Sequence, residues 1–365
     1  MIRIDEIYSS VFQPWLRQNR PGVRMIWFDP FGTTGIDNLQ SANELYACEH
    51  NYILFFDQEP IDIDRHQTVF QHVKDNNVSF APEKSILVTS EYESNSVETI
   101  CQNFNWNSRY YFFHGWASLD WFRGYNNSYL IVPPSERKIT HTFLCPMRII
   151  GGQRSHRVIM MSYLVRFGLH HNHISFPRYC PVEKQDWGEI AHSLEPVCPG
   201  IVESFTNHKA DNLFPRQFKN EHDHPMRSYQ LDLFTESAES LVYLVSETVA
   251  DGKRCHLTEK VFKPICLGMP FVLLSTVNSL QYLKKYGFKT FNEFWDESYD
   301  TEVNMVRRIE KIAQVLHALD RLTLKQKNDL WQNLIPIVEY NYQHFYNGGF
   351  EKVLKQELDM LLTSL

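Results

Sequence analysis

The sequence lacks any long apolar run. No stretch approaches the roughly 20 apolar residues that a membrane-spanning helix needs, and the N-terminus, MIRIDEIYSS, has neither the basic region nor the apolar core of a secretory signal peptide. The seven cysteines are scattered without a CxxC pair, which is typical of reduced thiols rather than of a disulfide framework. We therefore expect a cytoplasmic protein with no transmembrane segment.

Positive charge is also in short supply. The 36 Lys and Arg residues are outnumbered by 43 Asp and Glu residues, which gives a net charge of -7. Binding phosphate backbones over a broad surface needs an excess of positive charge, so this balance counts against a nucleic-acid partner. A local basic cleft would not change the net charge enough to be seen in it. The sixteen histidines form neither an HExxH motif nor a zinc spacing with cysteine, so no metal site is predicted.

The chain is long enough for two cores. With 365 residues, 43% of them hydrophobic, two domains of ordinary size are favoured over one very large core. The stretch IVPPSERK, residues 131–138, combines two prolines with charged residues and is typical of an exposed linker. We place an N-terminal domain at residues 1–135, a second domain at 136–335, and C-terminal helices at 336–365 that can pack back on the first domain.

Alternating strands and helices predict an α/β fold in both domains. Short apolar runs bounded by turn residues indicate buried strands in the first domain at 23–27, 53–56, 85–89 and 109–113. In the second domain, strands at 141–147, 240–247 and 270–275 alternate with helices, one of them capped by Ser275, and the chain after residue 300 is helical with breaks near 320 and 347–349. The region 177–227 shows no sustained period and is expected to be irregular or an inserted subdomain.

One segment of the second domain carries the pattern of a phosphate site. A strand ends at Glu247, a loop follows, and Thr258, Glu259 and Lys260 then open a helix whose first N–H groups are free. Such a helix start with a lysine favours phosphate, and Glu259 could accept hydrogen bonds from ribose hydroxyls. The alternative is an ordinary capping pattern beside a solvated lysine.

A second strand-turn-helix start lies earlier in the same domain. Gly151 and Gly152 allow a close approach of the backbone to a ligand, and Arg154 and Arg157 stand at the start of the following helix. Two helix starts with cationic side chains can clamp a diphosphate and neutralise it as a leaving group without a metal ion. The alternative is a solvated basic face.

The stretch LTEKVFKPICLGMPFV resembles the motif of the α-1,3-fucosyltransferase family. The match rests on five positions: Thr258, Glu259, Lys260, Gly268 and Pro270. The resemblance implies the GT-B architecture, with two Rossmann-like domains facing across a cleft and a nucleotide sugar, a GDP-sugar first of all, held by the C-terminal domain. It also implies that Arg157 binds the donor phosphates and that Glu259 and Lys260 contact ribose and phosphate, with no further cofactor.

The sequence departs from that family motif at two places near the bound donor. Residues 245–248 read Val-Ser-Glu-Thr where the family has phenylalanine-glutamate-asparagine-serine, and His256 replaces a tyrosine. By position, Glu247 and His256 remain candidates for donor binding. These changes leave the base and the sugar of the donor open, with fucose as one candidate.

A catalytic base is expected in the first domain. In ILFFDQEPIDID an apolar strand presents Asp57 and Glu59 at its carboxyl end, where open α/β sheets bind ligands. Transfer of a sugar with inversion needs a carboxylate that takes the acceptor proton, and Glu59 also matches the position of the family's proposed base. A turn with solvated acids is the alternative, and Asp62 and Asp64 form a DxD triplet that could hold a metal ion.

These patterns together predict an inverting glycosyltransferase that transfers a sugar from a nucleotide-sugar donor to a hydroxyl of a glycan or other acceptor. Two alternatives stay open. One is a glycosyltransferase that modifies hydroxymethylated nucleic-acid bases, and the other is a non-catalytic protein that binds nucleotide sugars or carbohydrates.

Overall fold

The computed structural model describes residues 13–21, 23–28, 51–56, 60–61, 63, 67, 71, 85–123, 128–180, 182–218 and 230–364. The contacts between Cα atoms divide the chain into two compact units. The first unit joins residues 1–120 to 252–256 and 351–365, and the second joins 121–251 to 257–350. The boundaries that composition suggests, at 135 and 335, stay a prediction.

The first unit contains a parallel sheet of four strands in the order β1-β2-β3-β4. Its strands are β1 (Val23–Phe28), β2 (Asn51–Phe56), β3 (Ser85–Thr89) and β4 (Asn107–Tyr110). In the described part of the chain, four helices belong to it wholly or in large part: α1 (Gln13–Asn19), α4 (Asn95–Phe104), α5 (Phe113–Arg123) and α14 (Gly349–Thr363). Ser94 caps α4, since its hydroxyl accepts a hydrogen bond from Val97 N.

The strand predicted at 109–113 ends earlier than expected. β4 stops at Tyr110, and Phe113 already begins α5 (Phe113–Arg123). The side chains of Tyr111, Phe112 and Phe113 are all fully buried. A short run of buried aromatic residues fits a strand and a helix start equally well, which is why the pattern misled the prediction.

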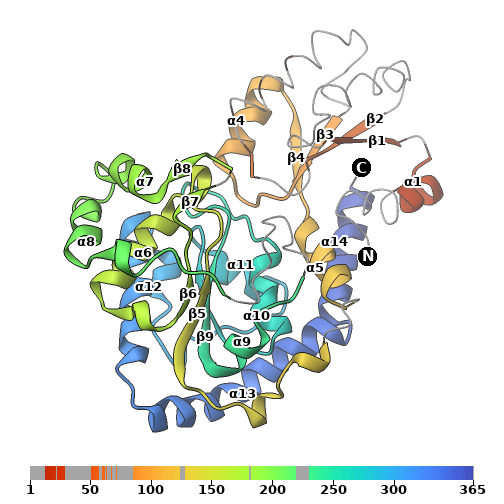
Figure 1. The fold of residues 1–365 in the computed structure, drawn as a ribbon. Helices are drawn as coiled ribbons and strands as arrows, with labels where there is room; N and C mark the ends of the chain where they lie inside the picture. The colour runs from red at the N-terminus through yellow and green to blue at the C-terminus, as the bar shows by residue number, and fades with distance from the viewer. Residues whose placement is uncertain are drawn as a thin grey trace. The chain divides into compact units, whose positions relative to one another are not determined.

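The second unit has a parallel sheet in the order β10-β9-β5-β6. Figure 1 labels its strands β5, β6 and β9. The strands are β5 (His141–Pro146), β6 (His173–Ser175), β9 (Ser240–Ser246) and β10 (Phe271–Leu274). From β5 the chain passes through α6 (His156–Arg166) to β6 on one side, whereas β9 and β10 follow on the other side. The step from β5 to β6 and the step from β9 to β10 (through α10, Phe262–Cys266) run in opposite directions across the sheet. Because both crossovers are right-handed, α6 and α10 lie on opposite faces of the sheet.

Burial explains the apolar runs in the second unit. Every residue of β9 is buried, and so is α6 from His156 to Val165. Elements that are covered on all sides show no amphipathic period, which fits the mostly apolar sequences of both. Helix α12 (Met305–Asp320) packs against α6 and β5, and α13 (Leu324–Tyr346) packs against α10. The predicted helical C-terminus, with breaks near 320 and 347, is confirmed.

Two local expectations for this unit need correction. Helix α11 (Ser279–Lys285) begins after Asn278 rather than at Ser275, and its first N–H groups donate to the carboxylate of Asp300. Of the two alternatives for residues 177–227, irregular structure is wrong for the described part, which forms a two-stranded ribbon of β7 (Tyr179–Cys180) and β8 (Gln185–Asp186) followed by α7 (Trp187–Leu194) and α8 (Ile201–Asn207). These elements lie between β6 and β9, as the other alternative, an inserted subdomain, allows. These elements are shorter than the window over which a period can be detected.

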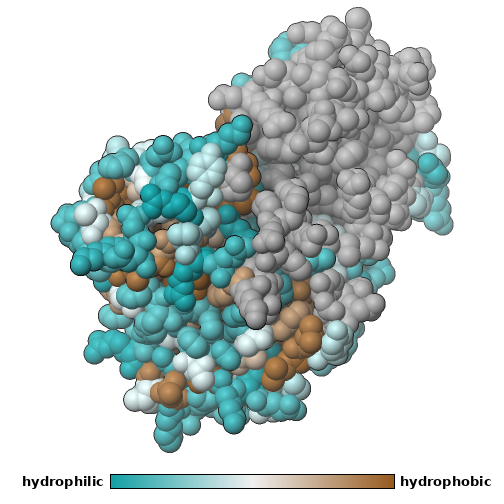
Figure 2. Space-filling view, viewed as in Figure 1, coloured by the Kyte–Doolittle hydropathy of each residue, from teal (hydrophilic) through white to brown (hydrophobic). Residues whose placement is uncertain are grey.

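The predicted fold class, α/β with parallel sheets in two units and a helical C-terminus, is therefore confirmed. The side of the second unit that Figure 2 shows is mostly hydrophilic, with small separate apolar areas. Within the described ranges, none of the helices is both long enough and apolar enough to cross a membrane.

Candidate functional site

The strand order of the second unit reverses between β5 and β9. β5 is followed by its neighbour β6, while β9 lies on the opposite side of β5 and is followed by β10. Ligands of open α/β sheets bind outside the carboxyl ends of the strands at such a reversal. In this chain those ends are followed by residues 147–152 after β5 and by 247–248 after β9, so both predicted phosphate motifs are adjacent to this edge.

Arg157 links the two strand ends. Its guanidinium donates to Ile149 O at 2.7 Å, which follows β5, and to Ser246 O at 2.7 Å and Glu247 O at 3.1 Å at the end of β9. Its Nε also donates to Ser246 Oγ at 3.3 Å. Burial, followed by the nearby charge of Arg154, lowers the pKa of Arg157 to about 10, so the side chain is still charged at neutral pH. Arg157 thus connects the residues that follow β5 to the end of β9 and places a buried positive charge between them.

Glu247 connects the end of β9 to the start of the second motif. Its carboxylate is fully buried and accepts hydrogen bonds from Thr258 N at 3.1 Å and from Thr258 Oγ1 at 2.6 Å. Burial raises the pKa of Glu247, while Lys260 and the bonds from Thr258 lower it. Glu247 therefore fixes the conformation of Thr258, which is the N-cap of η8 (Glu259–Val261).

Lys260 is the cation of this motif that reaches solvent. Its Nζ donates to Glu259 Oε1 at 2.9 Å, to Thr258 Oγ1 at 3.0 Å and to Thr248 Oγ1 at 3.3 Å. The Lys260 side chain is 29% exposed, whereas that of Glu259 is 7% exposed. An anion that approaches from solvent would meet the ammonium group of Lys260 and compete with Glu259 for it.

The glycine turn after β5 lies against the side chain of Glu183, and its predicted close approach to a ligand stays a prediction. Gly152 has φ +58°, and any side chain at Gly151 or Gly152 would collide with Glu183. Gly152 and Arg154 form η5 (Gly152–Arg154), the short 3-10 helix that precedes α6. The turn therefore places Arg154, which is half-buried, at the start of α6 in the same region as Arg157.

His256 is grouped with the first unit, apart from the other predicted donor residues. It is fully buried, its Nδ1 lies 3.3 Å from Ser90 Oγ, and its ring packs edge-on against His114 with the centroids 5.2 Å apart. The segment that carries it also pairs with the first unit through Cys255 and Tyr92. Its predicted contact with the donor stays a prediction.

Glu59, the predicted base, lies outside the described residues, as do Asp57, Asp62 and Asp64. The structure does describe Pro60 and Ile61, which follow Glu59 directly. Ile61 N donates to Glu91 Oε1 at 2.7 Å, and Arg254 Nη1 donates to Glu91 Oε1 at 3.2 Å and to Ile61 O at 3.3 Å. The buried Glu91 carboxylate, which follows β3, thus anchors the segment next to Glu59.

Sequence reasoning missed several side chains at these edges. His156 is buried, its Nε2 lies 3.3 Å from Ser246 Oγ, and burial followed by the charge of Arg157 lowers its pKa to about 3. Lys263 is buried 3.8 Å from Asp232, and burial lowers its pKa. The pattern of the sequence carries no signal for such pairs, because their partners come from distant segments.

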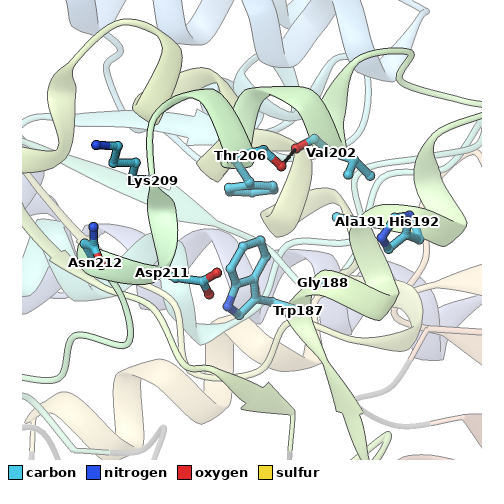
Figure 3. Close-up of a pocket in the computed structure, with 10 residues that line it drawn as sticks. Trp187, Gly188, Ala191, His192, Val202, Thr206, Lys209, Asp211 and Asn212 are labelled. Carbon is cyan, nitrogen blue, oxygen red and sulfur yellow. Dashed lines mark hydrogen bonds between the residues drawn. The ribbon is translucent and has the colours of Figure 1, made fainter.

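A separate cavity of about 390 Å³ opens between α7, α8 and the segment after α8 (Figure 3). Trp187 and Phe205 form its aromatic part, with ring centroids 4.5 Å apart. Its polar lining includes His192, Lys209 and Asp211. The residues that line it do not include the predicted donor residues.

No protein-family model matches the chain, and no curated protein matches its sequence. Several solved structures resemble it. One, described as trehalose-6-phosphate from E. coli bound with UDP-2-fluoro glucose, is 12% identical, with 96% of this chain and 77% of that chain covered and a TM-score of 0.40. Another, an alpha,alpha-trehalose-phosphate synthase (UDP-forming) from Burkholderia vietnamiensis, is 10% identical, with 97% and 79% covered and a TM-score of 0.41.

A third solved structure comes from work on enzymatic glycosyltransfer with retention by trehalose-6-phosphate synthase. It is 12% identical to this chain, with 93% of this chain and 76% of that chain covered and a TM-score of 0.41. Because these identities and TM-scores are low, we infer nothing about the site residues from the likeness.

Proposed function

We propose that the protein is a glycosyltransferase that binds a nucleotide-sugar donor at the carboxyl edge of the sheet in the second unit. One observation supports this most strongly. Two motifs about a hundred residues apart in the sequence are joined there by a chain of hydrogen bonds from Arg157 through Glu247 and Thr258 to Lys260. A diphosphate is the ligand that a helix start, a glycine turn and two cations fit best.

The contacts of Lys260 suggest how the donor would bind. A phosphate oxygen would replace Glu259 as a partner of Nζ, and Glu259 would then be available to accept hydrogen bonds from the ribose hydroxyls. Thr248 and Thr258 would keep Lys260 in place during this exchange. The buried charge of Arg157 would stabilise the diphosphate from the ends of β5 and β9, and Arg154 would approach the diphosphate from the glycine turn.

The chemical step in this proposal is a single inverting displacement. The acceptor hydroxyl gives its proton to Glu59, its oxygen bonds to the anomeric carbon, and the bond from that carbon to the phosphate oxygen breaks. The nucleoside diphosphate leaves with the bonding electron pair, and Lys260 and Arg157 stabilise its charge. We propose the GT-B architecture for the two units, with Glu59 in the first and the donor in the second.

The donor that we propose first is a GDP-sugar, with fucose as one candidate, and the acceptor is a hydroxyl of a glycan or another molecule. A thermal-shift panel with GDP, UDP, ADP, CMP and their sugars tests the donor class, because a ligand that prefers the folded state raises the melting temperature. Stabilisation by one nucleotide and its sugar supports the proposal. A panel in which none of them stabilises the protein contradicts it.

The anomeric configuration of the product tests the mechanism. We expect NMR of the first product to show a configuration opposite to that of the donor. Retention would refute the direct displacement assisted by Glu59 while leaving the donor site intact. Donor binding without transfer or hydrolysis under any condition would instead favour a binding protein, and strong salt-sensitive binding of DNA would favour a transferase that acts on nucleic acid.

A further inference from the structure

Three potential metal ligands meet at the amino edge of the sheet in the second unit. His141 is the first residue of β5, His173 is the first residue of β6, and Glu239 is the last residue of α9 (Phe234–Glu239), directly before β9. β5 lies between β6 and β9, and His141 is paired in register with Ser240. In the register of β5 and β6, His173 is paired with Leu144, yet its imidazole ring lies beside that of His141. Three side chains from distant parts of the sequence thus lie together.

The distances between these side chains suit a metal ion that all three would bind. His173 Nε2 lies 3.2 Å from Glu239 Oε2, and His141 Nδ1 lies 4.0 Å from the same oxygen. The two imidazole rings are 3.9 Å apart between their centroids, and one ligand atom from each of the three residues lies within 4.8 Å of the other two. Ligands about 2.1 Å from a tetrahedral zinc ion lie roughly 3.4 Å from one another, so small side-chain rotations would close the set.

We propose that His141, His173 and Glu239 bind a divalent transition-metal ion of the zinc type. Two imidazoles and one carboxylate form a ligand set that zinc uses in proteins, with a fourth position left for water or another ligand. All three residues are half-buried, so an ion can enter from solvent and still be partly shielded. A simple ion pair needs one histidine and one carboxylate. Here both imidazoles lie within 4.0 Å of the same oxygen, Glu239 Oε2.

Neighbouring hydrogen bonds hold the backbone of the ligands in place. Asp320 Oδ1 accepts from Thr142 Oγ1 at 2.5 Å and from Asn172 Nδ2 at 3.1 Å, and these two residues are the neighbours of His141 and His173. Asn172 Oδ1 in turn accepts from Thr142 N at 2.8 Å. These contacts fix the backbone at the starts of β5 and β6, which carry His141 and His173.

Thr140 ties the third ligand to the first. Its N–H donates to Glu239 O at 2.9 Å, and its hydroxyl lies 2.9 Å from His141 Nδ1. A metal ion at Nδ1 of His141 would replace the second of these contacts. The set is thus mostly organised before an ion binds, which lowers the ordering cost of binding.

This site would be structural and independent of the donor site. β5 runs from His141 to Pro146, and at about 3.3 Å per residue the two edges of the sheet are about 17 Å apart. A bound ion would link the starts of β5, β6 and β9 without contact to the diphosphate. The inference does not depend on the proposed function.

Titration of the full-length protein with Zn²⁺ and Co²⁺, after treatment with a chelator, tests the inference. We expect one Zn²⁺ per chain by calorimetry, and Co²⁺ to give the visible absorption of a site with nitrogen and oxygen ligands. His173→Ala and Glu239→Gln should each weaken Zn²⁺ binding by at least about 100-fold, the upper end of what even outer-shell changes cost. His192→Ala, which changes an exposed histidine on α7 of the same unit, should leave the affinity unchanged.

Circular dichroism checks that each variant is folded. If a variant does not fold, the titration of the wild-type protein still tests the inference. Failure of the wild-type protein to bind Zn²⁺ would overturn the inference. Binding that survives unchanged in folded His173→Ala or Glu239→Gln protein would also overturn it, because the ion would then be bound elsewhere.

Discussion

The buried carboxylate of Glu247 accepts hydrogen bonds from both the backbone N–H and the hydroxyl of Thr258. This contact joins the end of β9 to the start of η8 and so determines where Lys260 stands. Glu247→Gln would place an amide NH₂ opposite one of the two donors. We expect it to lower the free energy of unfolding by about 1–3 kcal/mol and to weaken donor binding.

Urea unfolding and donor calorimetry measure these two effects. Glu339→Gln, at an exposed position on α13, is the matched control and should change neither. A Glu247→Gln variant with the stability and donor affinity of the wild type would show that the contact to Thr258 does not organise the site.

Arg157→Lys tests the link between the two strand ends. A lysine has one ammonium group and cannot reach Ile149 O, Ser246 O and Glu247 O as the guanidinium does. We expect a loss of about 3 kcal/mol in the free energy of unfolding, because buried carbonyl groups and a buried charge lose partners. Urea unfolding measures it, with Arg321→Lys at an exposed position as the control. Wild-type stability would contradict the bridging role.

Burial of His156 predicts that acid destabilises the protein. Its pKa is about 3 in the folded state against 6.5 for the free side chain. Between these values only the unfolded chain binds the proton, so the folded state loses about 1.4 kcal/mol per pH unit as the pH falls. Urea unfolding of wild type and His156→Gln from pH 7 to pH 4 should show a smaller loss in the variant. Equal slopes would mean that His156 is protonated when folded.

Glu91→Gln tests whether the anchored segment matters for catalysis. The change weakens the contacts to Ile61 N and Arg254, next to the proposed base Glu59. We expect kcat to fall about tenfold, a small part of what general-base catalysis contributes, with the affinity for the donor unchanged. Steady-state kinetics separates kcat from KM. A change confined to the donor KM would place Glu91 in donor binding instead.

The sequence predicted elements well where one pattern dominates. The apolar run of β3 and the long amphipathic period of α12 and α13 were enough to place these elements. The end of β4 and the short helices α7 and α8 were missed, because aromatic burial and segments of two turns leave no distinct period.

The sequence named residues of the proposed site but not their contacts, and the role of these residues in donor binding stays a prediction. Chain spacing identified Arg157 and Lys260 as cations at helix starts, whereas the partners of Arg157 are carbonyl groups of a distant strand end. Local spacing does not predict that His256 groups with the first unit. It also does not predict that His141, His173 and Glu239 lie together. Such contacts arise from the order of strands in a sheet, which local sequence does not encode.

Donor binding by Lys260→Ala tests the central claim most directly. The variant should keep its melting temperature without ligand, because the Lys260 side chain is partly exposed, and lose at least about 100-fold in affinity for the nucleotide sugar that stabilises the wild type, together with all transfer. Lys325→Ala, which changes an exposed lysine on α13 with one surface ion pair, is the matched control and should bind and react normally. Full turnover by Lys260→Ala with donor in excess would contradict the account.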